Sequence, residues 1–194
     1  MLSSRIAGMD ANETSDYVEL MQLPIRYGHA LDMLGRARNR GDDALYERGQ
    51  GILRTAFAQD FIFEDLSADP VNVHGADGWA EFCARALGSF GGTQHFIAPP
   101  LVLIDEEPVE QDGVRLGGKA RLRSYLQATH TLPAEGEEMP EDTTDKTPTL
   151  MAGKNMVING TYEDECVREA VGWRIRRRSL RYTHIEARPF EADR

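Results

Sequence analysis

Residues 119–130 read Lys-Ala-Arg-Leu-Arg-Ser-Tyr-Leu-Gln-Ala-Thr-His, and small or apolar side chains alternate in them with larger polar ones. Successive side chains of a strand point to opposite faces of its sheet, so this period of two predicts a long strand with one buried face. Further strands are expected at 155–168 and 173–187, and another over 95–104, interrupted at Pro99-Pro100. The second half of the chain is therefore expected to be an antiparallel sheet.

The first half of the chain has helical spacing instead. From Tyr17 onward apolar residues recur every three or four positions, and Pro24 within this run is expected to kink the helix or to start a second one. A further helix is expected from about 43 to 60, a short strand at 61–64, and a last helix after Gly75. Helices followed by long antiparallel strands are typical of the α+β class, in which a strongly curved sheet around a helix pair leaves a ligand cavity.

Composition and charge limit the possible partners. The 194 residues carry a formal net charge of −10, which disfavours binding to the phosphate backbone of nucleic acids. The two cysteines, Cys83 and Cys166, lie in apolar stretches and are expected to be buried thiols in a reducing cytoplasm. The N-terminus has no apolar run of the signal-peptide kind, and no stretch approaches the roughly 18 apolar residues of a membrane span. We therefore expect a cytoplasmic protein without a membrane partner.

Two connections are acidic and poor in residues that pack. Residues 105–118 and 132–154 each read as a solvated hairpin tip. The second is long enough to offer an alternative, in which 132–154 folds over the cavity as a lid.

Six short stretches occur in the order typical of the SnoaL-like group of the nuclear-transport-factor superfamily. They are Tyr-Gly-His-Ala-Leu-Asp at 27–32, Phe-Ala-Gln-Asp-Phe-Ile-Phe-Glu at 57–64, Gly-Ala-Asp-Gly-Trp-Ala-Glu-Phe at 75–82, Thr-Gln-His-Phe-Ile at 93–97, Gly-Thr-Tyr-Glu-Asp-Glu at 160–165 and Gly-Trp-Arg-Ile-Arg-Arg-Arg at 172–178. The resemblance implies a cone-shaped α+β barrel whose mixed, mostly antiparallel sheet wraps around the N-terminal helices. It also implies a SnoaL-like domain over 16–187, with 1–15 a flexible N-terminus and 188–194 a tail.

The resemblance also implies a catalytic pair. Members that resemble scytalone dehydratase and hexachlorocyclohexane dehydrochlorinase use an Asp–His pair, and Asp32 and His95 stand at the matching positions. A neutral histidine can take a proton at neutral pH, and a carboxylate that accepts its Nδ1–H fixes the tautomer. The alternative is that neither residue is catalytic, with His95 a structural histidine on a strand and Asp32 a solvated aspartate on a helix.

Arg178 matches the arginine of the dehydrochlorinase-like pattern, where it would stabilise negative charge on a leaving or phenolic oxygen. Strict alternation sets Arg178 opposite Trp173 and Ile175, so either those two pack on the outer face or a bulge intervenes. The alternative is that Arg178 belongs to a solvated arginine face.

Three further side chains are candidates for binding the substrate. Tyr27 lies about one and a half helical turns before Asp32, Tyr162 matches a position that often faces the pocket in the family, and His130 shares strand parity with Leu126 and is placed at the cavity mouth. His184 has only its strand parity with Arg178 in its favour.

The function implied is that of a cofactor-independent and metal-free lyase. It would remove a proton and expel water, halide or formaldehyde from a small hydrophobic, hydroxylated aromatic compound, as in aromatic compound catabolism. An isomerase with the same pair is the nearest alternative. A non-catalytic small subunit of a ring-hydroxylating dioxygenase and a plain ligand-binding module are the others. The resemblance further implies a homodimer or homotrimer that packs through the outer sheet.

Overall fold

The computed structural model describes residues 8–66, 73–131 and 154–189, in which three helices precede most of the sheet. The helices are α2 (Ala11–Arg40), α3 (Asp43–Ala56) and α4 (Gly75–Gly88). The strands are β1 (Phe57–Asp65), β2 (Gly92–Ile97), β3 (Leu101–Glu106), β4 (Val109–Gln111), β5 (Val114–Leu116), β6 (Lys119–Thr131), β7 (Lys154–Glu169) and β8 (Gly172–Pro189). Residues 132–154, expected to be a solvated hairpin tip or alternatively a lid, lie outside the described residues except for the last one.

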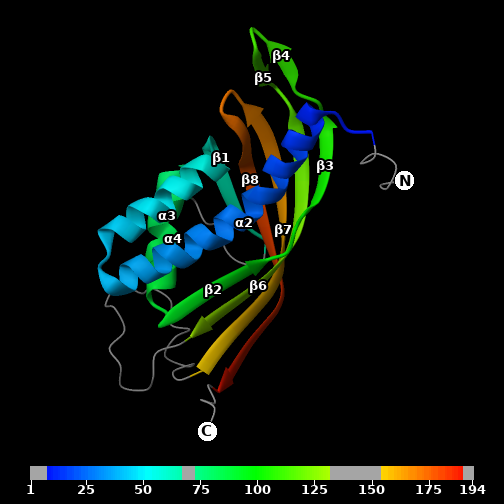
Figure 1. Ribbon diagram of the computed structural model, residues 1–194. Coiled ribbons are helices and arrows are strands. Elements are labelled where there is room, and N and C mark those ends of the chain that lie inside the picture. Colours follow the sequence, from blue (N-terminus) through cyan, green and yellow to red (C-terminus); the bar gives the residue numbers. More distant parts are fainter. Residues whose placement is uncertain (1–7, 67–72, 132–153, 190–194) are drawn as a thin grey trace.

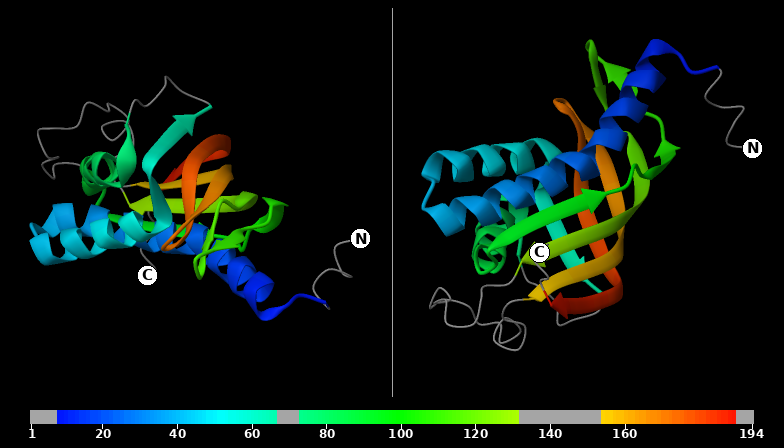
Figure 2. Two further views of the ribbon diagram at one scale, coloured as in Figure 1. Left: turned by 90° about the horizontal axis from the view of Figure 1, so that it is seen from above. Right: turned by 60° about the horizontal axis from the view of Figure 1, so that its bottom comes forward.

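One curved, six-stranded sheet forms the frame of the fold. Its strand order is β1-β8-β7-β6-β2, with β3 also pairing with β6, and all pairs are antiparallel except the parallel pair β1–β8. Figures 1 and 2 show the three helices on one side of this sheet, which curls around them. The α+β class and the mixed, mostly antiparallel sheet are thus confirmed, although the described strands form an open curl and not a closed ring.

The first helix is longer than the sequence indicates. The Asp10 side chain accepts from the backbone N–H groups of Asn12 and Glu13, and the Glu13 carboxylate accepts from Asp10, so a capping box starts α2 at Ala11. The expected domain boundary at residue 16 therefore falls inside a helix. Pro24 is buried within α2, which continues through it, so of the two alternatives for Pro24, a kink or a new helix, the start of a second helix is wrong.

The boundary between α3 and β1 also differs from the prediction. The helix ends at Ala56 instead of near Asp60, and the strand begins at Phe57, which pairs with Ile175 of β8. Phe57 completes the apolar spacing of the helix and at the same time stacks on Phe61 in the core, with ring centroids 3.7 Å apart. Because Phe57 fits both the apolar spacing of the helix and the inward face of the strand, the sequence pattern does not show where α3 ends and β1 begins.

Two bulges in β8 decide which side chains face the core. Glu165 pairs with Arg177 but Cys166 pairs with Ile175, so Arg176 is an extra residue and the next inward side chain is Arg178. The bulge alternative predicted for Arg178 is therefore confirmed. A second shift, at Thr183, leaves Tyr182 partly buried and turns His184 outward, with 57% of its side chain exposed.

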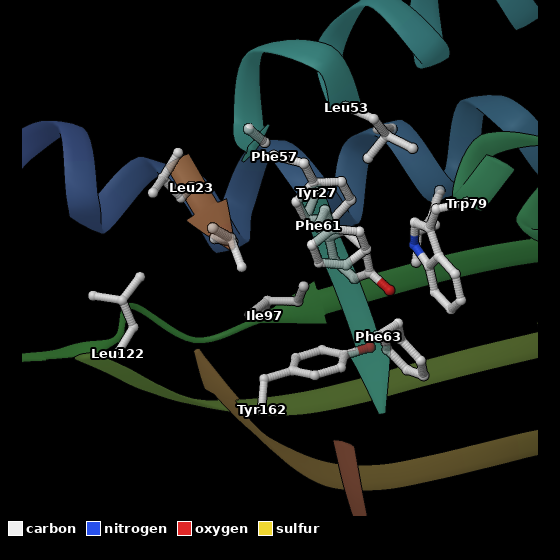
Figure 3. Close-up of a cluster of buried hydrophobic side chains, with 14 of the residues drawn as sticks. Leu23, Tyr27, Leu53, Phe57, Phe61, Phe63, Trp79, Ile97, Leu122 and Tyr162 are labelled. Atoms are coloured by element: carbon white, nitrogen blue, oxygen red, sulfur yellow. The ribbon is translucent and has the colours of Figure 1, made fainter. Parts of the chain in front are cut away.

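The core fills the space between the helices and the sheet. Figure 3 shows rings from α2, β1, α4 and β7 gathered in one aromatic cluster. Cys83 and Cys166 are buried free thiols, as predicted. Residues 105–118 contain the predicted exposed hairpin, which is made by β4 and β5. None of the described helices is both long and apolar enough to cross a membrane.

Candidate active site

Helix α2 and strand β2 bring Asp32 and His95 together, 63 residues apart in sequence. The Nδ1 atom of His95 lies 2.8 Å from Oδ1 of Asp32, and the backbone N–H of His95 donates to both carboxylate oxygens at 3.1 Å. A carboxylate acceptor at this position favours the tautomer of a neutral imidazole that carries its proton on Nδ1, and in that tautomer Nε2 keeps its lone pair. The His95 side chain is 6% exposed and that of Asp32 19%.

Glycines allow the helix to approach the strand this closely. A Cβ atom on Gly28 would stand 3.3 Å from the carbonyl oxygen of His95, and one on Gly35 would stand 2.9 Å from Cγ2 of Thr93. Gly28 and Gly35 are seven residues apart, hence on one face of α2, and Asp32 lies between them. The two glycines therefore let the backbones of α2 and β2 come close enough for Asp32 to meet both the ring and the backbone of His95.

His95 lies in the wall of a cavity of about 240 Å³ between the helices and the sheet. Its lining is mostly apolar and aromatic, with Leu31, Phe63, Trp79, Phe82, Cys83, Ala86, Leu87, Phe90, Leu126, Ala128, Met156, Ile158 and Leu180. The polar groups of the wall are His95, His130, Asp65, Tyr27, Tyr162 and Tyr182. A cavity of this kind suits a small, largely apolar ligand with a few polar substituents.

His130 is one of the residues that line the cavity. It is 3% exposed, stacks on Phe90 with ring centroids 4.5 Å apart, and meets the edge of the His95 ring at 5.5 Å. Burial, and to a lesser extent the neighbouring His95, lower the pKa of His130 to about 3. Its Nδ1 has no hydrogen-bond partner among the described residues. A neutral second imidazole therefore stands beside the Asp32–His95 pair.

Tyr27 and Tyr162 approach each other from α2 and β7. Their rings meet edge to face at 5.6 Å, and both belong to the aromatic cluster of Figure 3. Burial raises the pKa of Tyr162 to about 12 and that of Tyr27 well above its usual value, so both phenols stay protonated.

Arg178 packs behind these tyrosines. Its guanidinium carbon lies 4.1 Å from the ring centre of Tyr27 and 4.3 Å from that of Tyr162, while Asp164 accepts two bonds from it at 2.7 Å. Burial opposes its charge, but the attraction and hydrogen bonds of Asp164 prevail and raise the pKa of Arg178. Arg178 is buried as the bulge requires, yet it is not among the residues that line the cavity.

The sequence model of the SnoaL-like domain matches residues 12–179. The chain belongs to the SnoaL-like domain family. No curated protein matches it by sequence.

Solved structures with the same fold resemble this SnoaL-like chain at low sequence identity. The protein Kfla4162 from Kribbella flavida has a TM-score of 0.60 at 18% identity, over 89% of this chain and 94% of that one. A proposed scytalone dehydratase from Novosphingobium aromaticivorans DSM 12444 has a TM-score of 0.55 at 19% identity, over 96% and 100%. The hexachlorocyclohexane dehydrochlorinase LinA-type3 from Novosphingobium barchaimii LL02 has a TM-score of 0.60 at 10% identity, over 95% and 100%. These likenesses establish the fold.

Three further residues of the cavity wall in this SnoaL-like domain, Trp79, Tyr182 and Asp65, were not predicted as site residues. Trp79 was predicted only as part of the buried face of its helix, and its Nε1 has no partner among the described residues. Tyr182 shares strand parity with Arg178, which was the one available signal for it. Asp65 follows Phe63 by two positions on β1 and carried no signal. Within the described parts of the chain, no three His, Cys, Asp or Glu side chains are grouped so as to hold a metal ion.

Proposed function

We propose that this protein is a cofactor-independent lyase that removes a proton from a small, largely apolar ring compound and eliminates a leaving group from the neighbouring carbon. One observation carries the proposal: a histidine held at Nδ1 by a carboxylate lies in the wall of a mostly apolar cavity. A proton transfer followed by elimination needs neither a redox cofactor nor a Lewis acid, because the electron pair of the broken C–H bond forms the new double bond.

His95 is the proposed base. Its Nε2 lone pair takes the proton, the C–H electron pair becomes the C=C bond, and the leaving group departs with its own bonding pair. Asp32 holds the tautomer and stabilises the imidazolium that forms. If hydroxide leaves, the imidazolium returns its proton to give water; if halide leaves, the proton passes to solvent. If formaldehyde is lost, His95 takes the hydroxymethyl O–H proton and the O–H electron pair forms the C=O bond of formaldehyde. The C–C electron pair then forms the new C=C bond as hydroxide leaves the neighbouring carbon, and the imidazolium protonates it to water.

His130 is proposed to bind the substrate as a neutral hydrogen-bonding group. With a pKa of about 3 it is not protonated at neutral pH, so it is suited to orienting an oxygen and not to donating a full proton. Tyr27 and Tyr162 are proposed to offer their hydroxyl groups to the same substrate.

Arg178 is proposed as a positioning residue that acts through these tyrosines. Its charge lies against both rings and is largely balanced by Asp164. The predicted direct stabilisation of a leaving oxygen by Arg178 is thereby replaced by support of the two phenols.

An isomerase is the second candidate. His95 lies in the wall of the cavity, so after it takes a proton from one carbon of the bound substrate its imidazolium can deliver a proton to another carbon. The two reactions differ in one respect: an isomerase leaves the mass of its substrate unchanged.

The experiment is incubation of the purified protein, without added cofactor, with hydroxylated and halogenated aromatic and bicyclic compounds. Mass spectrometry then detects loss of water, hydrogen halide or formaldehyde. The variants are His95→Ala and Asp32→Asn, with His184→Ala on the exposed part of β8 as the matched control. We expect turnover in the wild type and His184→Ala, and its loss in the two dyad variants. Binding of the compounds without any turnover would favour a ligand-binding or assembly module instead.

A further inference from the structure

The turn between α4 and β2, residues 89–91, carries an aromatic ring of the cavity wall. This ring belongs to Phe90, which stacks on His130 with ring centroids 4.5 Å apart and planes inclined by 22°. The rings of His130 and His95 in turn meet edge to face, with centroids 5.5 Å apart. His130 is therefore in contact with Phe90 and with the proposed base at the same time.

Backbone and side-chain bonds hold this turn against α2 and β6. The carbonyl oxygen of Phe90 accepts from the side-chain amide of Asn39, near the end of α2. The N–H of Gly91 donates to the carbonyl oxygen of Thr131 at 2.7 Å, and Thr131 follows His130 on β6. The backbone is thus fixed next to both stacked rings, and these bonds define where the phenyl ring lies relative to the imidazole.

The orientation of the His130 ring depends on these ring contacts. A histidine is commonly oriented by a hydrogen bond at one of its ring nitrogens, but Nδ1 of His130 is buried and has no partner among the described residues. Stacking on Phe90 supplies a constraint in its place, because aromatic rings prefer stacked or edge-to-face arrangements. His130 is 3% exposed while Phe90 is only partly buried, so the phenyl ring also shields one face of the imidazole from solvent.

This shielding matters because of the charge that His130 would carry in water. Burial is the main cause of its low pKa of about 3, and the neighbouring His95 is the smaller cause. Within the described parts of the chain, the titratable groups on this side are His95 on β2 and, held at its Nδ1, Asp32 on α2, whereas β7 contributes the uncharged Met156. An imidazolium at 5.5 Å would oppose the positive charge that His95 gains with a proton.

We propose that Phe90 is a positioning residue that holds the His130 imidazole uncharged and in a fixed orientation beside His95, so that a substrate at His95 meets a neutral hydrogen-bonding group. Phe90 acts through His130 and takes no part in the bond changes. The inference rests on the proposed function for the use of His130 by the substrate, while the stacking and the shielding do not depend on any reaction.

The test is an NMR titration of the His130 Cε1–H resonance, assigned by its absence from His130→Phe, which needs neither substrate nor turnover. Phe90→Leu keeps an apolar side chain and removes the flat ring, whereas Phe90→Tyr keeps the ring. Phe96→Leu is the matched control, since Phe96 lies on the outer face of β2 and is 66% exposed.

In the wild type, Phe90→Tyr and Phe96→Leu, we expect His130 not to titrate above about pH 5. In Phe90→Leu the pKa of His130 should rise by about one unit or more, a tenfold higher affinity for the proton, because water reaches the uncovered face of the ring.

An unchanged pKa of His130 in Phe90→Leu would overturn the proposal, since other contacts would then keep the ring neutral. An equal rise in Phe90→Tyr or in Phe96→Leu would overturn it as well, because a general loosening of the fold would then be the cause. Failure of the proposed function has a different result. In that case the pKa of His130 still depends on Phe90, but no elimination depends on His95.

Discussion

The carboxylate of Asp164 and the guanidinium of Arg178 form a two-point ion pair, at 2.7 Å for each bond, from which solvent is wholly excluded. The pair lies on adjacent strands, β7 and β8, and supports the rings of Tyr27 and Tyr162 from behind. A buried charge is tolerable only with its partner, so this pair links the fold to the two phenols of the proposed site.

Arg178→Met should lower the free energy of unfolding by about 3–5 kcal/mol, because it leaves the Asp164 carboxylate buried and unpaired. Arg177→Met on the same strand removes a pair with Glu64 whose side chains are 44% and 34% exposed, and should cost less than about 1 kcal/mol. Urea unfolding of both variants makes the comparison. Equal losses would show that Arg178 and Asp164 are in contact with water in solution.

His130 should make the fold sensitive to acid. The folded-state pKa of about 3 lies below the ordinary value of 6.5, so the unfolded chain binds the proton first as the pH falls. The stability due to the neutral, buried ring is therefore complete above pH 6.5 and is lost progressively between about pH 6.5 and 3, at about 1.4 kcal/mol per pH unit. His130→Phe keeps the stacking on Phe90 and removes the titration.

The measurement is the difference in unfolding free energy between wild type and His130→Phe at several pH values from 7 to 4. Carboxylates that titrate in both proteins contribute equally to the two unfolding free energies, so their contribution cancels in this difference. A difference that stays constant over this range would contradict the buried, neutral state of His130.

Gly35→Ala should separate α2 from β2. The added methyl group would stand 2.9 Å from Leu87 Cβ and from Thr93 Cγ2, and Thr93 lies two positions before His95. We expect a loss of about 1–3 kcal/mol in stability from overpacking, with a lower rate of any reaction that depends on the Asp32–His95 contact. Gly51→Ala is the matched control, since nothing lies within 4 Å of its added Cβ, and in α3 it should stabilise by about 0.5–1 kcal/mol. Thermal unfolding of both variants measures these opposite changes in stability, and a Gly35→Ala protein as stable as the wild type would contradict the close contact of α2 with β2.

Much of this architecture could be predicted because hydrophobic periodicity reports local structure directly. The alternation of β6 was correct along its whole length, with each inward residue from Ala120 to His130 buried. The helix–strand boundary at Phe57 was not predictable, because one phenylalanine satisfies the pattern of both elements. The start of α2 was missed because its capping box precedes the apolar residues.

The orientation of residues in β8 depends on pairing with β7, which no local pattern reports. The bulge at Arg176 turns Arg178 inward, and the bulge at Thr183 turns His184 outward although the two share strand parity. Asp32 and His95 were predicted as a pair from the resemblance, and the structure places them in contact. Their roles in catalysis stay a prediction, as do those of the tyrosines.

Proton removal from carbon by His95 is the central claim, and hydrogen–deuterium exchange tests it without knowledge of the leaving group. The bicyclic ketone 2-tetralone, whose ring protons beside the carbonyl are acidic, is incubated with the protein in D₂O, and deuterium uptake is followed by NMR. We predict exchange accelerated by the wild type and by His184→Ala, and slowed about 10²–10⁴-fold in His95→Ala, with a loss in Asp32→Asn as well. Exchange that is as fast in His95→Ala as in the wild type, or bound tetralone that shows no accelerated exchange, would contradict the account.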